Sequence, residues 1–454
     1  MAKKAYIVTG LGYGDEGKGS IVDWLTAEQN VHTIIRTGGP QALHRVVTRE
    51  GIEHVFSQFG SGSLRGAKTH LSRHMLTAPS ALLREGTLLQ TKCAHDVFAR
   101  VTIHKDSLLV TPVQAIAGRV RELLRGKQRR GSVGVGVGET VRDAEKLGHV
   151  ALRAEDLHSP NLPQRIWDLW QYKRSAYESY ADRASGLPEP LGSTIRAELA
   201  SMTEDGQLQK TIGEFTELAK RVQVVDDDYV ARNILASDGT IVIEGSQGVL
   251  LDRVHGFYPY TTKVRATPET GRDILTTGYY TGRVHSLGIL RSYATRHGYG
   301  PFVTEDVALT KALPDAKNHN DLWQGNFRVG HFDAVASRYA AAVCGAGAID
   351  NIVLTCLDRT DKLDTWSACT VYQHQNTRAR WQAENLVREN STSPRELGLK
   401  LGEYLPVLQH IDQQQSPGMT NQTRQIETIA ALLNLPVYAV SAGATEKDKF
   451  LYKG

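Results

Sequence analysis

The chain has 454 residues and a formal net charge of +4, and 22% of its residues are charged and 41% hydrophobic, as is ordinary for a globular protein. The charge excess is too small to indicate a nucleic-acid partner, although it suits small anionic substrates. The four cysteines are scattered without metal-ligand or disulfide spacing, and no apolar stretch reaches the 18 residues of a membrane span, so we expect a cytoplasmic protein with no membrane partner.

The first predicted element is a buried strand at residues 5–8, which leads into a glycine-rich loop at residues 9–20. Four glycines let this loop turn tightly and bring its N–H groups against an anion. Lys18 precedes a predicted helix at residues 21–25, and a helix N-terminus favours phosphate. The pattern therefore predicts a phosphate-binding loop. These four glycines are Gly12, Gly14, Gly17 and Gly19, and a fifth, Gly10, opens the loop.

Two carboxylates, Asp15 and Glu16, lie inside the same loop. Carboxylates beside phosphates indicate either Mg²⁺ binding or proton transfer. The spacing does not match the G-x-x-x-x-G-K-[ST] signature of a Walker A loop. The loop is therefore predicted to be functional, although a glycine-rich turn between a strand and a helix can also be purely structural.

Further along the chain, strand-like and helix-like segments alternate, which predicts an α/β fold around a mostly parallel central sheet. Leu, Ala, Glu and Arg dominate a polar middle region, so we expect a helical insertion or subdomain at about 95–235. The expected strands after the first are residues 33–36, 240–244, 351–354 and 436–440. The expected helices include residues 113–124, 333–343 and 422–432.

Several motifs together resemble those of the adenylosuccinate synthetase family. The family loop G-x-x-x-G-D-E-G-K-G-K, followed by I-V-D-x-L, is similar to residues 10–25. Its E-G-A-Q-G-x-L-L-D and H-G-x-Y-P-Y-V-T segments resemble residues 244–252 and 255–262, and its L-G-I-L-K-A-Y-x-T-R and G-P-F-x-T-E segments resemble residues 287–296 and 300–305. The resemblance implies a single domain over residues 1–454, related to P-loop NTPases, with a variable segment at about 360–430.

The resemblance also implies a reaction. The family phosphorylates an amide-type carbonyl oxygen of a nucleotide acceptor from a nucleoside triphosphate, and an amine then displaces the phosphate. This assigns Asp15 as the base that removes the ring N–H proton and as a ligand of Mg²⁺. The family's G-G-H-N-A-G-H is similar to residues 38–44, which makes His44 the acid that steadies the reacting oxygen.

On the nucleotide side, the family's T-K-L-D is similar to residues 355–358, so the guanine-reading Asp358 is kept while the lysine has become Cys356. The S-T-G-P turn resembles residues 441–444 and supplies Ser441 and Gly443. GTP is therefore the expected co-substrate and ATP the alternative. The loop residues assigned to the nucleotide are Gly12, Gly14, Glu16, Gly17, Lys18 and Gly19.

On the acceptor side, Gln41 replaces a family asparagine, Thr262 is kept, and Gln247 and Leu251 match the second motif. A family threonine has become Val133. Arg265 then either compensates electrostatically for the acceptor phosphate or is an ordinary surface charge.

The amine-donor site departs furthest from the family. The family clamps aspartate with G-x-T-T-G-R-R-R-R-x-G-W-x-D, which is similar to residues 320–333. Only Arg328 survives from the arginine run, the threonines have become Leu322 and Trp323, and two arginine positions hold Gly325 and Phe327. Because arginine binds carboxylates bidentately, a dicarboxylic donor has lost its usual partners. Trp323, Phe327 and Arg328 are predicted to shape the altered donor loop.

Three interpretations remain. The first is a divergent ligase with an altered acceptor or amine donor, the second is adenylosuccinate synthesis from IMP, L-aspartate and GTP, and the third is a nucleotide-binding sensor without ligase activity. The missing arginines separate the first from the second, and the intact Asp15, Lys18, His44 and Gln247 argue against the third. The resemblance also implies a homodimer, because the family completes its acceptor site with an arginine from the neighbouring subunit, although that arginine has no clear counterpart near residues 146–153.

Overall fold

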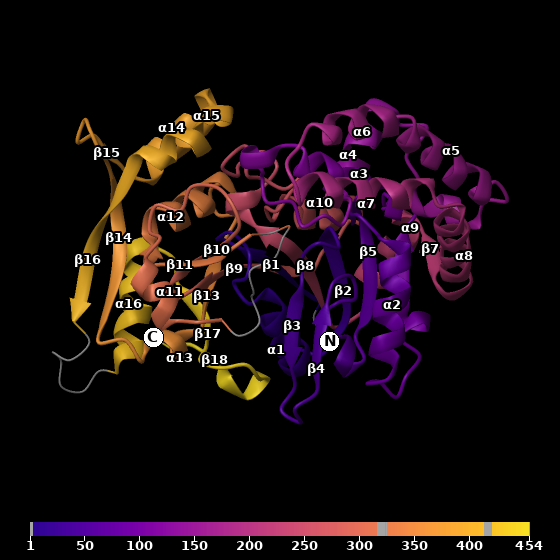
Figure 1. Ribbon diagram of the computed structural model, residues 1–454. Helices are drawn as coiled ribbons and strands as arrows, with labels where there is room; N and C mark the ends of the chain where they lie inside the picture. Colours follow the sequence, from indigo (N-terminus) through magenta and orange to yellow (C-terminus); the bar gives the residue numbers. More distant parts are fainter. Residues whose placement is uncertain (1–2, 316–322, 324, 413–419, 454) are drawn as a thin grey trace.

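The computed structural model describes residues 3–315, 323, 325–412 and 420–453. A ten-stranded sheet in the order β18-β17-β13-β9-β1-β8-β2-β5-β6-β7 crosses the molecule, and all its ladders are parallel except β17–β18 (Figure 1). The prediction of an α/β fold with a mostly parallel sheet is thereby confirmed. The strands are β1 (Lys4–Gly10), β2 (Val31–Gly38), β5 (Lys68–Met75), β6 (Val101–His104), β7 (Gln223–Val225), β8 (Thr240–Gly248), β9 (Arg283–Arg291), β13 (Asn351–Thr355), β17 (Val437–Ser441) and β18 (Lys449–Leu451).

Both faces of the sheet are covered, which is why its central strands read as nearly continuous apolar runs. Successive residues of β1 point to opposite faces. On one face Tyr6 and Val8 pack with Ile21 and Leu25 of α1 (Lys18–Glu28). On the other face, Ala5 and Ile7 join a cluster with Ile274 and Leu275 of α10 (Glu269–Thr277). The expected strands coincide with β1, β2, β8, β13 and β17.

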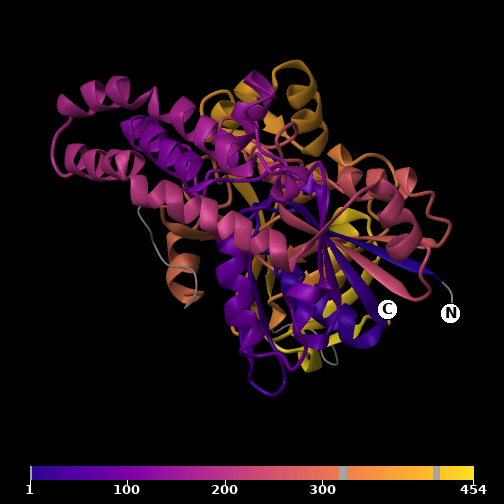
Figure 2. The same cartoon turned by 90° about the vertical axis from the view of Figure 1, so that its right-hand side faces the viewer.

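The helical insertion lies between two strands at one edge of this sheet. Helices α3–α8 run from the end of β6 to the start of β7 and stack beyond that edge, in magenta in Figures 1 and 2. Their apolar faces form one cluster that includes Trp170, Ile195 and Phe215. The helices are α2 (Pro79–Gln90), α3 (Pro112–Leu123), α4 (Val137–Lys146), α5 (Leu162–Arg174), α6 (Tyr177–Ser185), α7 (Leu191–Thr203), α8 (Asp205–Arg221) and the short α9 (Asp227–Tyr229).

The C-terminal third packs at the opposite end (Figure 1). A smaller sheet of β12, β14, β15 and β16 lies there with α12, α14 and α15, and α16 packs against α12. The expected helices at residues 333–343 and 422–432 correspond to α12 and α16. The bounds are α11 (Val307–Ala312), β12 (Phe332–Asp333), α12 (Ala334–Val343), α13 (Leu357–Thr360), β14 (Thr365–His374), β15 (Arg380–Trp381), α14 (Ala383–Thr392), α15 (Pro394–Lys400), β16 (Tyr404–Asp412) and α16 (Asn421–Leu433).

Two hairpins border the carboxyl ends of the central strands. They are β3 (His44–Val47) with β4 (Glu53–Phe56), and β10 (Ala294–His297) with β11 (Phe327–Gly330). In a parallel sheet, loops that follow neighbouring strands meet at this edge, where ligands bind. The segments after β1, β2, β8, β9, β13 and β17, which carry the predicted site residues, all leave from it. Within the described part of the chain, no helix is both long and apolar enough to cross a membrane.

Candidate active site

The glycine loop connects β1 to α1 as a tight turn. Gly14 and Gly17 adopt φ angles of +92° and +91°, which glycine tolerates without strain, and Asp15 between them has φ +60°. Aspartate is one of the few residues with a side chain that populates this left-handed region. The turn starts α1 at Lys18, so Lys18 and the first free N–H groups of the helix lie at the carboxyl edge of the sheet.

The Glu16 carboxylate points back into the loop. It accepts hydrogen bonds from the N–H groups of Gly12 at 3.0 Å and Gly14 at 2.8 Å, and Lys18 Nζ donates to it at 2.6 Å. Burial acts to raise the pKa of Glu16, but the Lys18 ammonium and the hydrogen bonds outweigh it, so the pKa is lowered. The carboxylate is therefore ionised and holds the loop in shape.

The Asp15 side chain, in contrast, is partly exposed, at 30%, and its Oδ2 lies 3.7 Å from His297 Nδ1. The backbone carbonyl of Asp15 accepts a hydrogen bond from Arg291 Nε. Arg291 ends β9, so the strand next to β1 fixes the loop at the residue that carries the exposed carboxylate.

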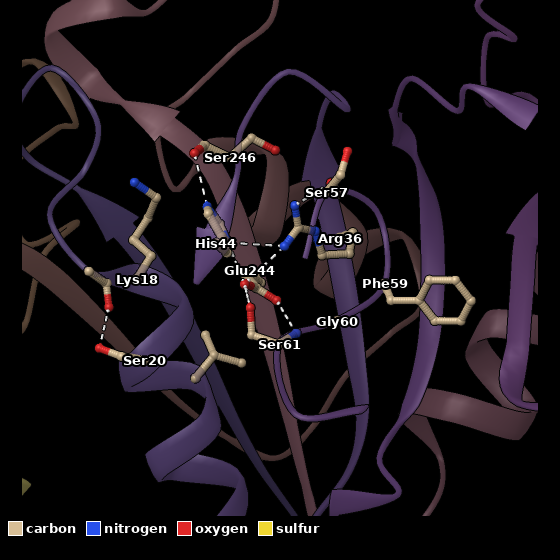
Figure 3. Close-up of polar contacts among 12 residues, drawn as sticks. Lys18, Ser20, Arg36, His44, Ser57, Phe59, Gly60, Ser61, Glu244 and Ser246 are labelled. Atoms are coloured by element: carbon tan, nitrogen blue, oxygen red, sulfur yellow. Dashed lines mark hydrogen bonds and ion pairs between the residues drawn. The ribbon is translucent and has the colours of Figure 1, made fainter. Parts of the chain in front are cut away.

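His44 belongs to a buried polar cluster centred on Glu244 (Figure 3). His44 Nδ1 lies 2.6 Å from Glu244 Oε1, Arg36 Nη1 lies 2.9 Å from the same oxygen, and the Ser61 N–H donates to Oε2 at 3.0 Å. His44 Nδ1 also lies 3.0 Å from Arg36 Nη1, which can only donate, and Nε2 lies 3.2 Å from the Ser246 carbonyl oxygen, which can only accept. Glu244 therefore orients the imidazole.

The charges in this cluster are tightly coupled. Burial alone would raise the pKa of Glu244, but the Arg36 guanidinium, His44 and Ser61 lower it to about 2. Burial and then Arg36 lower the pKa of His44, against the opposing pull of Glu244. At neutral pH the cluster therefore holds an ionised Glu244, a charged Arg36 and a neutral His44.

Replacing Glu244 by glutamine should lower the free energy of unfolding by about 3–5 kcal/mol, because Arg36 would stay buried without a counter-charge. Urea unfolding at pH 7 measures this loss. As a control, Glu53→Gln removes a pair with Arg45 in which both side chains are 37% exposed, and this should cost less than about 1 kcal/mol. Equal losses in the two variants would contradict the assignment.

The same cluster should make stability fall in acid. Since the folded pKa of Glu244 is lowered to about 2, its contribution is present above the unfolded pKa of about 4.3 and is lost as the pH falls through the folded pKa.

The predicted acceptor residues gather at the turn after β2. Gln41 Nε2 donates to Thr262 Oγ1 at 3.3 Å, and the Thr262 N–H donates to the Leu251 carbonyl oxygen at 2.8 Å. The buried Oε1 atoms of Gln41 and Gln247 have no hydrogen-bond partner within the described part of the chain. Buried amide oxygens without a partner are suited to a ligand that donates N–H groups.

Arg265 forms ion pairs with two nearby carboxylates. Its Nη2 lies 2.5 Å from Glu269 Oε2, and its Nε lies 3.4 Å from the buried Asp252 Oδ2. Asp252 also accepts the N–H groups of residues 254, 255 and 266, and so shapes the loop that carries Thr262. The structure thus brings Gln41, Leu251 and Thr262 together, while Arg265 is held by two carboxylates.

The predicted base-recognition residues lie at the carboxyl ends of two adjacent strands. β13 pairs with β17, so residues 356–358 and 441–443 follow neighbouring strand ends. Thr355 Oγ1 donates to the Glu16 carbonyl oxygen at 2.7 Å, which links this region to the glycine loop. Asp358 lies in α13, and Ser441 Oγ donates to the Gly443 carbonyl oxygen at 3.2 Å.

The predicted donor residues are placed by the β10–β11 hairpin, except that Leu322 lies outside the described residues. Arg328 Nη1 donates to Glu305 Oε2 at 2.7 Å, and its Nη2 donates to the carbonyl oxygens of Gly298 at 2.6 Å and Gly300 at 3.0 Å. The guanidinium is therefore largely used within the protein. Trp323 lies 5.9 Å from the Arg119 guanidinium carbon, against α3.

Four polar residues of this region were not singled out from the sequence: Arg36, Ser61, Glu244 and His297. Arg36 and Glu244 are charges inside apolar strand segments, which is itself a signal of a buried functional or structural pair. Ser61 and His297 give no such signal, because their contacts arise only when distant segments meet.

The sequence is similar to known proteins over most of its length. The family model described as adenylosuccinate synthetase matches residues 7–450. A curated adenylosuccinate synthetase of Pseudomonas putida is 32% identical over 383 residues, covering 82% of this chain and 81% of that protein. The Azotobacter vinelandii adenylosuccinate synthetase is 29% identical over 474 residues, covering 99% of both chains.

Two solved structures share the fold. The fully ligated adenylosuccinate synthetase of Plasmodium falciparum superposes with a TM-score of 0.76 at 20% identity, covering 99% of each chain. The succinoaminodeoxyadenylate synthetase of cyanophage S-2L, bound to dGMP and to dATP as an energy donor, gives a TM-score of 0.57 at 16% identity, covering 100% of this chain and 97% of its own.

Proposed function

This chain belongs to the adenylosuccinate synthetase family, and we propose that it is a triphosphate-dependent ligase that forms a C–N bond on a nucleotide-like acceptor with an altered amine-donor site. The observation that carries the proposal is the convergence of the partly exposed Asp15, the buried Lys18 and the oriented His44 at one edge of the sheet. The acceptor's amide-type oxygen attacks the γ-phosphorus, and an amine then displaces the phosphate.

In this mechanism Asp15 removes the ring proton, which makes the oxygen nucleophilic, and its exposure allows it to reach the acceptor. Glu244 orients His44 through Nδ1. His44 Nε2 faces the Ser246 carbonyl oxygen, so it carries a hydrogen and is the nitrogen that donates to the reacting oxygen and the phosphoryl group. Gln41 and Gln247 offer their unpaired amide oxygens to the acceptor.

Magnesium fits this site as an ion held chiefly by the nucleotide. Within the described part of the chain, no group of three or more His, Cys, Asp or Glu side chains is arranged to hold a metal. Mg²⁺ commonly uses one or two carboxylates together with substrate phosphates, and Asp15 supplies one such oxygen group. When bound, the ion would neutralise phosphate charge.

The Lys18→Ala variant should bind triphosphate at least about tenfold more weakly, because a charge-assisted contact to phosphate is lost. Calorimetry with GTP and ATP in the presence of Mg²⁺ measures this loss. We expect GTP to bind more tightly to the unaltered protein, since Asp358 can pair with guanine N1–H and N2–H, groups that adenine lacks. Tighter binding of ATP would mark Cys356 as part of an altered base site, and unchanged binding by the variant would contradict the role of Lys18.

The test of the overall proposal is positional isotope exchange in GTP labelled at the β–γ bridging oxygen, whose label moves to the non-bridging positions of the β-phosphate, measured with IMP and without any amine. Reversible phosphorylation of the acceptor scrambles the label, and a sensor without ligase activity leaves it in place. Ordinary adenylosuccinate synthesis is the second candidate, favoured by the names of the relatives, and an aspartate assay separates it from the first.

The assembly and the compartment belong to the same proposal. We place the enzyme in the cytoplasm as a homodimer, because the four cysteines are free and the family implies a shared acceptor site. Light scattering that gives a single 50.0 kDa species at micromolar concentration would contradict the dimer.

A further inference from the structure

A histidine of the β10–β11 hairpin lies directly beside the exposed carboxylate of the glycine loop. His297 Nδ1 is 3.7 Å from Asp15 Oδ2, and the His297 side chain is only 11% exposed. In the hairpin register, His297 pairs with Phe327, and their rings meet edge to face with centroids 5.1 Å apart. Phe327 occupies a position that the family's donor loop gives to an arginine. The histidine therefore lies between the reacting centre and the altered donor loop.

The second ring nitrogen of His297 is buried and has no hydrogen-bond partner within the described part of the chain. The Asp15 carboxylate favours the tautomer with its hydrogen on Nδ1, the nitrogen that faces it, which leaves a lone pair on Nε2. A buried acceptor without a partner is unfavourable in a native protein unless a ligand or water satisfies it. Nε2 is thus suited to accept a hydrogen bond from an N–H group.

The arginines of the hairpin donate most of their N–H groups within the protein, and Arg296 Nη2 and Arg328 Nε have no partner within the described part of the chain. Arg328 is held by Glu305 and two carbonyl oxygens. Arg296 is almost fully buried and donates to the carbonyl oxygens of Tyr299 at 3.2 Å and Pro301 at 2.6 Å. This surface combines an acceptor nitrogen with an aromatic ring, so it fits an amine with an uncharged substituent.

We propose that His297 and Phe327 form the amine subsite, in which His297 Nε2 accepts a hydrogen bond from the attacking amino group. The inference rests on the proposed function and names its donor class, a primary amine without a side-chain carboxylate. The C–N bond forms as the C–O bond to phosphate breaks, and the bonding pair leaves with the phosphate. Surplus amine protons pass to the departing phosphate and to solvent, so His297 keeps its protonation state and serves to bind and aim the nucleophile.

Two substitutions distinguish the roles of the two ring nitrogens of His297. Glutamine keeps a polar group near the position of Nε2, whereas asparagine keeps one near Nδ1 and leaves nothing at Nε2. With IMP, GTP and Mg²⁺, and hydroxylamine as the amine, His297→Asn should raise the KM for hydroxylamine at least about tenfold, while His297→Gln should stay within about threefold of the unaltered enzyme. Isotope exchange without amine should be unchanged in both, because it precedes the amine. His374→Asn, in β14 of the smaller sheet and paired with Glu403 at 3.1 Å, is the matched control and should change neither quantity.

The outcomes distinguish failure of the proposed function from failure of the amine subsite alone. No isotope exchange in the unaltered enzyme overturns the proposed function and the inference with it. Normal isotope exchange together with an unchanged KM for hydroxylamine in His297→Asn overturns the inference alone. Isotope exchange in the unaltered enzyme without any product from hydroxylamine also overturns it, because an open amine subsite must admit so small a nucleophile. Loss of exchange in His297→Asn would mean that the histidine acts through Asp15, which also overturns the amine subsite.

Discussion

Replacing Asp15 by asparagine should lower the rate of phosphoryl transfer by at least about 10²-fold, the lower range for a positioned general base. The amide cannot take the acceptor's ring proton, yet it keeps the size of the side chain. The backbone should also be undisturbed, because asparagine tolerates the φ of +60° observed at this position as well as aspartate does. The loss is therefore expected to be chemical and not structural.

Isotope exchange with IMP and GTP measures this loss, and thermal unfolding checks that the fold is kept. Asp182→Asn changes an exposed aspartate of α6 and should leave the exchange rate unaltered. His44→Asn, made in parallel, should also lose at least about 10²-fold, since the imidazole is the group that Glu244 orients. Near-normal turnover in either active-site variant would show the mechanistic assignment to be wrong.

L-Aspartate and IMP should form a poor substrate pair for this enzyme. Two arginine positions of the family's carboxylate clamp hold Gly325 and Phe327, and Arg328 is engaged with Glu305. Each lost hydrogen bond to a charged group costs roughly 1.5–3 kcal/mol, so two losses together weaken aspartate binding by more than about a hundredfold. A phosphate-release assay with IMP, GTP and increasing aspartate measures the constant, and a micromolar value with robust turnover would restore ordinary adenylosuccinate synthesis.

Restoring an arginine to the donor loop gives a second test of aspartate binding. Phe327→Arg should lower the aspartate constant, because it returns a cation to the donor loop at a β-strand position that accepts a side chain. Gly325→Arg should not help, since Gly325 has φ +84° and a Cβ there would lie 3.3 Å from the Gly298 Cα. Improvement by Gly325→Arg alone would contradict the structural account.

The central sheet could be predicted from the sequence because its strands are buried on both faces and read as short apolar runs between turn residues. The glycine loop could be predicted as well, because its spacing between a strand and a helix is locally encoded. The direction of a loop side chain is not encoded locally. Asp15 and Glu16 are neighbours of the same chemical type, yet one is exposed and the other lies under the loop on Lys18.

Contacts between segments that are distant in the sequence could not be predicted either. His297 meets Asp15 only because β9 is the neighbour of β1 and the hairpin after β9 folds back over the loop. Arg265 and Arg328 look like free cations in the sequence, and their partners Glu269 and Glu305 become evident only in the fold. Whether a charged side chain forms an ion pair depends on the three-dimensional arrangement, which composition and motif spacing do not determine.

The buried position of Glu16 has a consequence for how this loop can change in evolution. A Cβ placed on Gly10, Gly12 or Gly248 would lie 2.3, 3.1 or 2.5 Å from a Glu16 carboxylate oxygen, and none of the three has a left-handed φ. Gly10 and Gly12 are thus constrained by the space that one carboxylate fills, and not by backbone twist, whereas a Cβ on Gly248 would also lie 2.0 Å from the Gly12 carbonyl oxygen. In a collection of related sequences, positions 10, 12 and 16 should vary as a set, and a library that selects alanines at Gly10 and Gly12 should recover them only where residue 16 has become smaller.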